Sequence, residues 1–200
     1  MTPGLKQLKT TISKRFPPLK PFVSLTRLDR PIGIYLLLWP TLTALWIASE
    51  GWPGWHLLLV FTLGTVLTRS AGCIVNDLAD MKFDGNVKRT RNRPLISGQV
   101  ASLEALLLAG CIAFVALLLV LTTNLYTVYM SIFAVIIAAI YPFMKRYTYL
   151  PQAFLGIAFS WGIPMTFTAV SNEIATVAWL LLIANLLWVV AYDTQYALVD

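Results

Sequence analysis

The residues with the clearest chemical potential are acids, and they gather in two short stretches of the chain. Five of the nine acidic residues lie in Asn76–Asp84 or Asp193–Asp200. Within the first stretch, Asn76, Asp80 and Asp84 recur at intervals of four residues, so a helix would carry them on one stripe. The two acids of the second stretch are seven residues apart, which also places them on one helix face.

The chemistry that this pattern suggests is cation binding. Asp77 lies beside the stripe, and carboxylates packed so closely repel one another unless a cation neutralises them. Neither stretch contains histidine or cysteine, and donors that are oxygen alone favour Mg²⁺. Protein-bound Mg²⁺ usually completes its coordination with water and substrate phosphates. One surface aspartate would indicate only a solvated helix end, whereas two clusters at the ends of apolar segments favour a functional site.

Basic residues follow both the first acidic stretch and a later apolar segment. These residues are Lys88, Arg89, Arg91, Arg93, Lys145 and Arg146. They can set membrane topology and attract anionic lipid headgroups. They can also neutralise the oxygens of a diphosphate, and both roles are compatible. Arg69 is different, because it lies inside an apolar run, about 12 Å of helix before Asp77. We expect it to face the bundle interior, paired with an acid or a substrate anion.

The elements that must position these residues are membrane helices. Of the 200 residues, 58% are apolar and 12% are charged, against about 25% charged in a soluble domain. A membrane-spanning helix needs roughly 20 apolar residues, so the composition predicts about six. The expected segments are Pro31–Ser49, Trp55–Asp77, Ala101–Thr122, Leu125–Met144, Pro151–Val170 and Ile174–Tyr192. This excludes a soluble enzyme and predicts an all-α, polytopic transmembrane helix bundle.

Charge decides how the segments are oriented. The net charge of +6 lies in basic residues between apolar runs, which indicates membrane topology and no nucleic-acid partner. Every second connection is basic, beginning with the N-terminal stretch, so the N-terminus, 78–100, 145–150 and the C-terminal end are expected to face the cytoplasm. Both acidic stretches then lie on one face of the membrane. We expect a basic cytoplasmic tail over 1–30 and a transmembrane domain over 31–200, in a bacterial inner membrane or, alternatively, a mitochondrial inner membrane.

The acidic motif and several other stretches of the sequence resemble the UbiA prenyltransferase family. Asn76, Asp77, Asp80 and Asp84 match the family's NDxxDxxxD motif. Most of the chain is also similar to the branch of the family that prenylates 4-hydroxybenzoate. The matching stretches are Arg27–Gly33, Arg69–Asp77, Lys88–Leu95, Tyr141–Thr148 and Tyr192–Asp200. Members of the family have about nine membrane helices and a second acidic motif. The resemblance therefore implies a UbiA-like domain with about six of those helices, incomplete at the C-terminus.

The resemblance also implies an activity and its residues. The expected reaction transfers a polyprenyl group from polyprenyl diphosphate to the ring carbon of 4-hydroxybenzoate that is ortho to the hydroxyl, in ubiquinone biosynthesis. Asn76, Asp80, Asp84 and Asp200 are expected to hold Mg²⁺, with Asp77 and Asp193 supporting or sharing that catalytic role. Lys88, Arg89, Lys145 and Arg146 are expected to contact the diphosphate. Arg27 or Arg69 is expected to bind the acceptor carboxylate.

Three other functions are compatible with parts of the pattern. Another branch of the family would prenylate haem, a naphthoate, homogentisate or a chlorophyllide. CDP-alcohol phosphatidyltransferases also carry aspartates at helix ends, but their motif begins with Asp-Gly and differs in order. A cation or proton transporter would line its path with carboxylates, usually near the middle of the bilayer. The acids here lie at the expected cytoplasmic boundary, which favours prenyl transfer.

Overall fold

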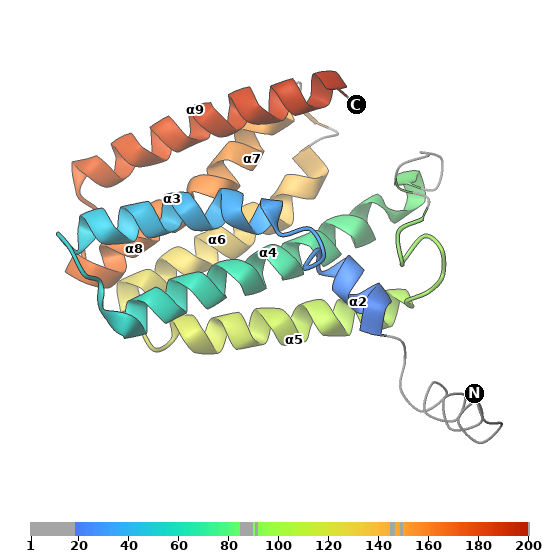
Figure 1. The fold of residues 1–200 in the computed structure, drawn as a ribbon, viewed down its shortest axis with the longest axis horizontal. Helices are drawn as coiled ribbons and strands as arrows, with labels where there is room; N and C mark the ends of the chain where they lie inside the picture. The colour runs from blue at the N-terminus through green and yellow to red at the C-terminus, as the bar shows by residue number, and fades with distance from the viewer. Residues whose placement is uncertain (1–18, 85–89, 91, 145–146, 149, 200) are drawn as a thin grey trace, which may run out of the picture.

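The structure, a computed structural model, describes residues 19–84, 90, 92–144, 147–148 and 150–199. These residues form an all-α bundle, which confirms the expected fold class (Figure 1). The helices are α2 (Leu19–Leu25), α3 (Ile32–Ala48), α4 (Gly54–Asp84), α5 (Ser102–Val120), α6 (Leu125–Met144), α7 (Pro151–Ser160), α8 (Gly162–Ser171) and α9 (Thr176–Val199).

The bundle has the lengths and the surface of a multi-pass membrane protein. Five spans are long and apolar enough to cross a bilayer, and the shorter α3 adds a sixth apolar helix. The surface carries large apolar side chains, such as Leu103 (66% exposed), Val135 (65%) and Leu180 (61%). Such side chains would be costly in water but are suited to lipid. The six apolar segments expected from the sequence are therefore confirmed as helices.

The fifth expected segment differs in detail, because a break at Trp161 divides it into α7 and α8. Pro164 has no backbone N–H and its ring crowds the carbonyl of Ser160, so a continuous helix is disfavoured there. The indole of Trp161 donates to the Met130 carbonyl on α6 over 2.9 Å, which secures the break. Gly162 follows, and a Cβ there would lie 2.5 Å from Oγ1 of Thr41 on α3.

Helix α4 is longer than expected and carries the whole first acidic stretch. It runs for 31 residues, about 46 Å at 1.5 Å per residue, whereas a bilayer core is about 30 Å thick. The helix therefore continues beyond the apolar run, and its last turns place Asn76 to Asp84 at and beyond one membrane boundary.

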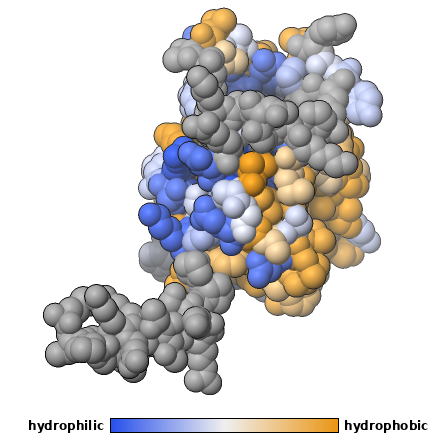
Figure 2. Space-filling view, turned by 90° about the vertical axis from the view of Figure 1, so that its right-hand side faces the viewer, coloured by the Kyte–Doolittle hydropathy of each residue, from blue (hydrophilic) through white to orange (hydrophobic). Residues whose placement is uncertain are grey.

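The two ends of the bundle have different character. The α3–α4, α5–α6 and α8–α9 connections lie at the left of Figure 1, whereas α2 and the C-terminal ends of α4 and α9 lie at the right. Hydrophilic side chains gather over part of the right-hand end (Figure 2). This is the end where the charge pattern predicts the cytoplasm, and it carries both acidic stretches.

Residues 94–100, which precede α5, are packed into this end. Leu95 and Val100 are buried with Leu25 of α2, Ile74 of α4 and Ala105 of α5 in one hydrophobic cluster. Part of the stretch expected to be a tail is therefore helical and contributes to the core. Burial of these side chains holds α2 and residues 94–100 against the C-terminal end of α4.

Candidate functional site

The acidic stripe of α4 is half-buried where its side chains are described. Asn76 and Asp80 have intermediate exposure, and at 3.6 residues per turn they lie on the same side of the helix. Arg69 belongs to this side too, because it precedes Asn76 by seven residues, about 10 Å deeper in the membrane. The backbone of Asp84 continues the stripe, and its side chain lies outside the described part of the structure.

Asp77 is distinguished from its neighbours by burial and by two arginines. Its side chain is 3% exposed. Arg27 Nη2 donates to both of its oxygens, over 3.1 Å to Oδ1 and 3.0 Å to Oδ2. Arg93 Nη1 donates to Oδ1 over 2.9 Å. The carboxylate therefore lies between two guanidinium groups, one from the turn after α2 and one from the segment before α5.

The backbone at Arg27 explains how its side chain reaches α4. The Leu28 N–H donates to the Val23 carbonyl and the Arg27 N–H to the Ser24 carbonyl, which is the Schellman arrangement at a helix C-terminus. Arg27 takes the left-handed position of that motif, with φ of 59°. Glycine is usual at this position, so an arginine there indicates that its side chain has a role.

Tyr141 connects the two acidic stretches. It lies on α6, within electrostatic range of Asp193 on α9 and of Arg69 and Asp80 on α4. Asp193 is half-buried, like Asp80. The fold therefore brings the start of the second stretch to the same interior region as the first. Tyr141 falls within one of the stretches that resemble the family but was not predicted to be a site residue, because a single tyrosine among many apolar residues carries no clear signal.

Arg69 lies within the bundle with part of its hydrogen-bonding capacity unused. Its guanidinium carbon is 5.5 Å from the centre of the Phe159 ring on α7, a cation–π contact. A Cβ at Gly33 of α3 would lie 2.8 Å from Arg69 Nη2, so the glycine makes room for this side chain. The buried Nε of Arg69 has no hydrogen-bond partner among the described residues. A half-buried cation with a buried, available donor is suited to an anionic ligand.

Several expected site residues cannot be placed. Lys88, Arg89, Lys145, Arg146 and Asp200 lie outside the described residues. Within residues 19–81 and the other side chains that are described, no three His, Cys, Asp or Glu side chains are grouped so that they could hold a metal. The donors that remain, the Asn76 amide and the Asp80 and Asp193 carboxylates, are oxygens of the kind that Mg²⁺ prefers.

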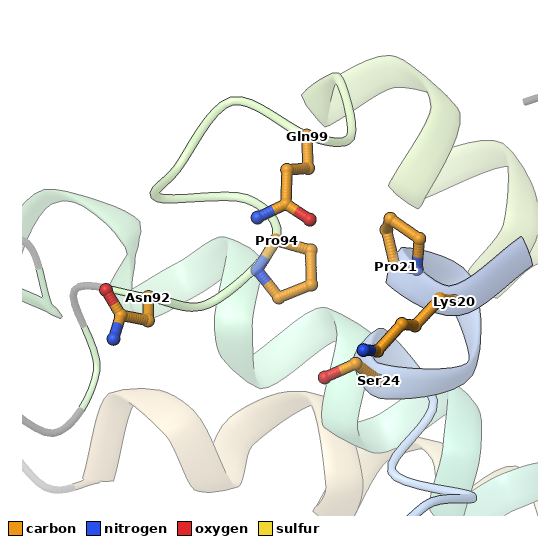
Figure 3. A pocket seen from close by; sticks show the side chains of 6 residues that line it. All are labelled: Lys20, Pro21, Ser24, Asn92, Pro94 and Gln99. Atoms are coloured by element: carbon orange, nitrogen blue, oxygen red, sulfur yellow. The ribbon is translucent and has the colours of Figure 1, made fainter. Parts of the chain in front are cut away.

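A hollow of about 390 Å³ opens at the end of the molecule where α2 lies. It lies between α2 and the segment before α5 and is lined by Lys20, Pro21, Ser24, Asn92, Pro94 and Gln99 (Figure 3). None of the expected site residues lines it. It marks where residues 92–99 meet α2, next to Arg93.

The site therefore combines oxygen donors at the membrane boundary with a cation deeper in the apolar bundle. Such an arrangement can hold a metal and a phosphorylated group at its mouth, an apolar chain between the helices and a small anion at Arg69. Apolar walls also exclude water from a reactive intermediate.

Comparison with solved structures gives the same architecture. A UbiA homologue from Aeropyrum pernix K1 aligns with a TM-score of 0.73 and 28% identity, covering 84% of this chain and 63% of that one. A UbiA homologue from Archaeoglobus fulgidus, solved with GPP and Mg²⁺, aligns with a TM-score of 0.68 and 16% identity, over 88% of this chain and 62% of that one. At that identity the second similarity concerns the fold alone.

Comparison of sequences gives much closer relatives. A 4-hydroxybenzoate octaprenyltransferase of Pseudomonas putida (strain W619) is 59% identical over 194 residues, covering 97% of this chain and 66% of the relative. One from Colwellia psychrerythraea is 60% identical over 176 residues, covering 88% of this chain and 61% of the relative. The chain thus spans about two thirds of the length of these relatives. The model of the UbiA prenyltransferase family matches residues 37–200. The chain belongs to the UbiA prenyltransferase family.

Proposed function

We propose that the protein is an intramembrane prenyltransferase of ubiquinone biosynthesis. It transfers a polyprenyl group from polyprenyl diphosphate to the carbon of 4-hydroxybenzoate that is ortho to the hydroxyl. The names of the bacterial relatives at 59% and 60% identity support this substrate pair. Their bacterial origin also supports a bacterial inner membrane, with the acidic end on the cytoplasmic side.

The observation that carries the proposal is that Tyr141 on α6 lies between acids of the two stretches. Tyr141 lies within electrostatic range of Asp80 on α4, Asp193 on α9 and Arg69. Oxygen donors from two helices thus approach one region at the membrane boundary. A diphosphate held there would leave its polyprenyl chain among the apolar helices, where water is excluded.

The donor chemistry fits Mg²⁺. Asn76, Asp80 and Asp84 on α4, together with Asp200, would hold the ion, and Asp193 would support it from α9. When bound, Mg²⁺ neutralises charge that develops on the diphosphate as the allylic C–O bond breaks. The homologue from Archaeoglobus fulgidus was solved with Mg²⁺ and GPP, which supports this choice of ion. Lys88, Arg89, Lys145 and Arg146 would bind the remaining diphosphate oxygens.

The acceptor carboxylate is assigned to Arg69 rather than to Arg27. The unused Nε of Arg69 is buried, and Phe159 packs against the guanidinium group. Arg27 is already paired with Asp77. Arg69 is about 10 Å below Asn76 along α4, so a benzoate bound to it would direct its hydroxyl end toward the diphosphate. The ortho carbon would then face the allylic carbon.

Another branch of the family is the main alternative. Acceptors such as haem, a naphthoate or homogentisate would use the same acidic end, and acceptor choice would depend on the region around Arg69. Cation transport is disfavoured because the described acids lie at helix ends and not at mid-bilayer depth.

The test measures prenyl transfer by the protein in lipid nanodiscs containing Mg²⁺. Polyprenyl diphosphate is supplied with 4-hydroxybenzoate, a dihydroxynaphthoate or homogentisate, and products are identified by mass spectrometry. We expect product from 4-hydroxybenzoate alone. Asp80→Asn should reduce the rate by at least about 100-fold, since charge stabilisation at a leaving group is typically worth that much. Asp29→Asn, an exposed acid at the same end, is the matched control and should retain full activity. Product from another acceptor, or full activity of Asp80→Asn, would refute the proposal.

A further inference from the structure

Resting on the proposed function, we propose that Asp77 is a positioning residue and not a metal ligand. It lies within the NDxxDxxxD motif, between the expected metal ligands Asn76 and Asp80. Its carboxylate instead holds Arg27 and Arg93 against α4. The pair of arginines then places positive charge beside the diphosphate site.

The oxygens of Asp77 are already occupied by arginine. Three N–H···O bonds of 2.9 to 3.1 Å reach the two oxygens, two from Arg27 and one from Arg93. Charge-assisted bonds of this kind are among the strongest in proteins. Mg²⁺ binding to either oxygen would require displacement of a guanidinium group from a carboxylate that is only 3% exposed.

Electrostatic repulsion also disfavours a metal ion at Asp77. A divalent cation at Asp77 would lie next to two guanidinium charges, and this repulsion is screened little in a buried site. Asp77 also projects about 100° around α4 from Asn76, at 3.6 residues per turn. It therefore faces the packed side of the helix, toward α2 and the segment before α5, as its partners show.

The two ion pairs also leave excess positive charge beside the acidic stripe. One carboxylate facing two guanidinium groups leaves a net charge of about +1 at the cytoplasmic end of α4. The side chains of Arg27 and Arg93 are 24% and 20% exposed, so this charge still reaches the surface of the site. A diphosphate bound at Asn76 and Asp80 would be attracted by it.

The arginines are held from two independent directions. Arg27 follows α2, whose Leu25 is fully buried, and Arg93 precedes Leu95, which packs into the same hydrophobic cluster. The hydrophobic cluster keeps these segments folded when Asp77 is changed. The ion pairs set where the two guanidinium groups lie and add local order around Arg93, so positioning is separable from global folding.

The experiment compares Asp77→Asn, Arg93→Gln and the double variant Asp77→Asn/Arg93→Gln in nanodiscs. Arg93→Gln preserves the Arg27–Asp77 pair, so it should fold even if Asp77→Asn does not. Affinity is measured by titration with a non-hydrolysable geranyl thiodiphosphate at saturating Mg²⁺. We expect each single variant to bind about 10-fold more weakly, and the double variant to be no weaker than either, because the residues act through one contact. Asp29→Asn is the control for removal of one exposed charge.

Two further readouts distinguish positioning from metal binding and from simple stability. Cd²⁺ should restore binding to Asp80→Cys, where a thiolate replaces a metal ligand, and should not restore it to Asp77→Cys. Hydrogen exchange without ligand should increase in peptides that cover residues 92–100 in Asp77→Asn and Arg93→Gln. Rescue of Asp77→Cys by Cd²⁺, or unchanged exchange and affinity in both single variants, would overturn the inference.

The same data separate this inference from the proposed function. If the wild-type protein fails to bind the prenyl diphosphate analogue, the proposed function fails. Increased exchange in residues 92–100 would then still support Asp77 as the anchor of the two arginines. If the wild-type protein binds and Asp80→Asn does not, while both Asp77→Asn and Arg93→Gln bind normally, the proposed function stands and the positioning role is wrong.

Discussion

Arg27 offers a quantitative test of the turn that delivers it to Asp77. Its φ of 59° and the two Schellman hydrogen bonds place it where a Cβ is unfavourable. For an L-residue the left-handed conformation costs about 1–2 kcal/mol. Glycine avoids this cost but loses about 0.4–1 kcal/mol through its greater freedom in the unfolded chain. Arg27→Gly should therefore be about 1 kcal/mol more stable than Arg27→Ala.

Both variants lose the ion pair with Asp77. Hydrogen bonds to a charged group contribute about 1.5–3 kcal/mol when buried, and this pair is partly exposed, so about 2 kcal/mol is a reasonable loss. Asp77 retains Arg93, so its charge is not left unpaired. We therefore expect Arg27→Ala to lose about 2 kcal/mol and Arg27→Gly about 1 kcal/mol of unfolding free energy.

The assay is equilibrium unfolding by SDS in mixed micelles, followed through the fluorescence of the seven tryptophans. Thr68, exposed in the middle of α4, provides the matched control. There Thr68→Gly should be less stable than Thr68→Ala by about 1 kcal/mol, because both adopt helical φ. The sign of the glycine–alanine difference should thus reverse between the two positions. An alanine at position 27 that equals or exceeds glycine in stability would refute the left-handed turn.

Two further predictions concern packing away from the acidic end. Asn124→Ala should lose about 2 kcal/mol of unfolding free energy without changing ligand affinity. The reason is that the Asn124 side chain accepts from the Thr127 N–H, which caps α6, and donates to the Thr168 carbonyl of α8. A loss below about 0.5 kcal/mol would contradict this network. Gly162→Ala should lose about 1–3 kcal/mol of unfolding free energy, because the added Cβ would lie 2.5 Å from Thr41 Oγ1. The double variant Gly162→Ala/Thr41→Ala should recover most of this stability. Gly64→Ala is the control for Gly162, because a Cβ added at Gly64 would meet no atom of another part of the chain within 4 Å. This variant should be neutral or stabilising in the same unfolding assay.

The membrane helices were predictable because the signal for each is local. An apolar run long enough to cross a bilayer must satisfy its backbone polar groups within itself, so it forms a helix whatever its neighbours are. The expected side of the membrane rests on nearby basic residues by the same kind of local reasoning, and it stays a prediction. The break between α7 and α8 was not predicted, although Gly162 and Pro164 were visible signals. A glycine and a proline inside an apolar run are common enough in membrane helices that they do not by themselves specify a break.

The acidic site was predictable in part. The spacing of Asn76, Asp80 and Asp84 predicts a shared helix face, and residues 76–84 do lie on one helix. Spacing cannot distinguish Asp77 from its neighbours, because its environment is created by Arg27, 50 residues earlier, and by Arg93, 16 residues later. Tyr141 was missed as a site residue for the same reason: its proximity to Asp80, Asp193 and Arg69 joins three helices.

The sequence by itself determined that this chain crosses a membrane as a bundle of helices and where its acids gather along the chain. Those properties depend on the polarity of neighbouring residues, which is written along the chain. Only the tertiary structure decided which acid is buried between arginines and which residues surround Arg69. Those properties depend on contacts between helices far apart in sequence, where close packing and the low dielectric of the interior give each neighbour a large effect.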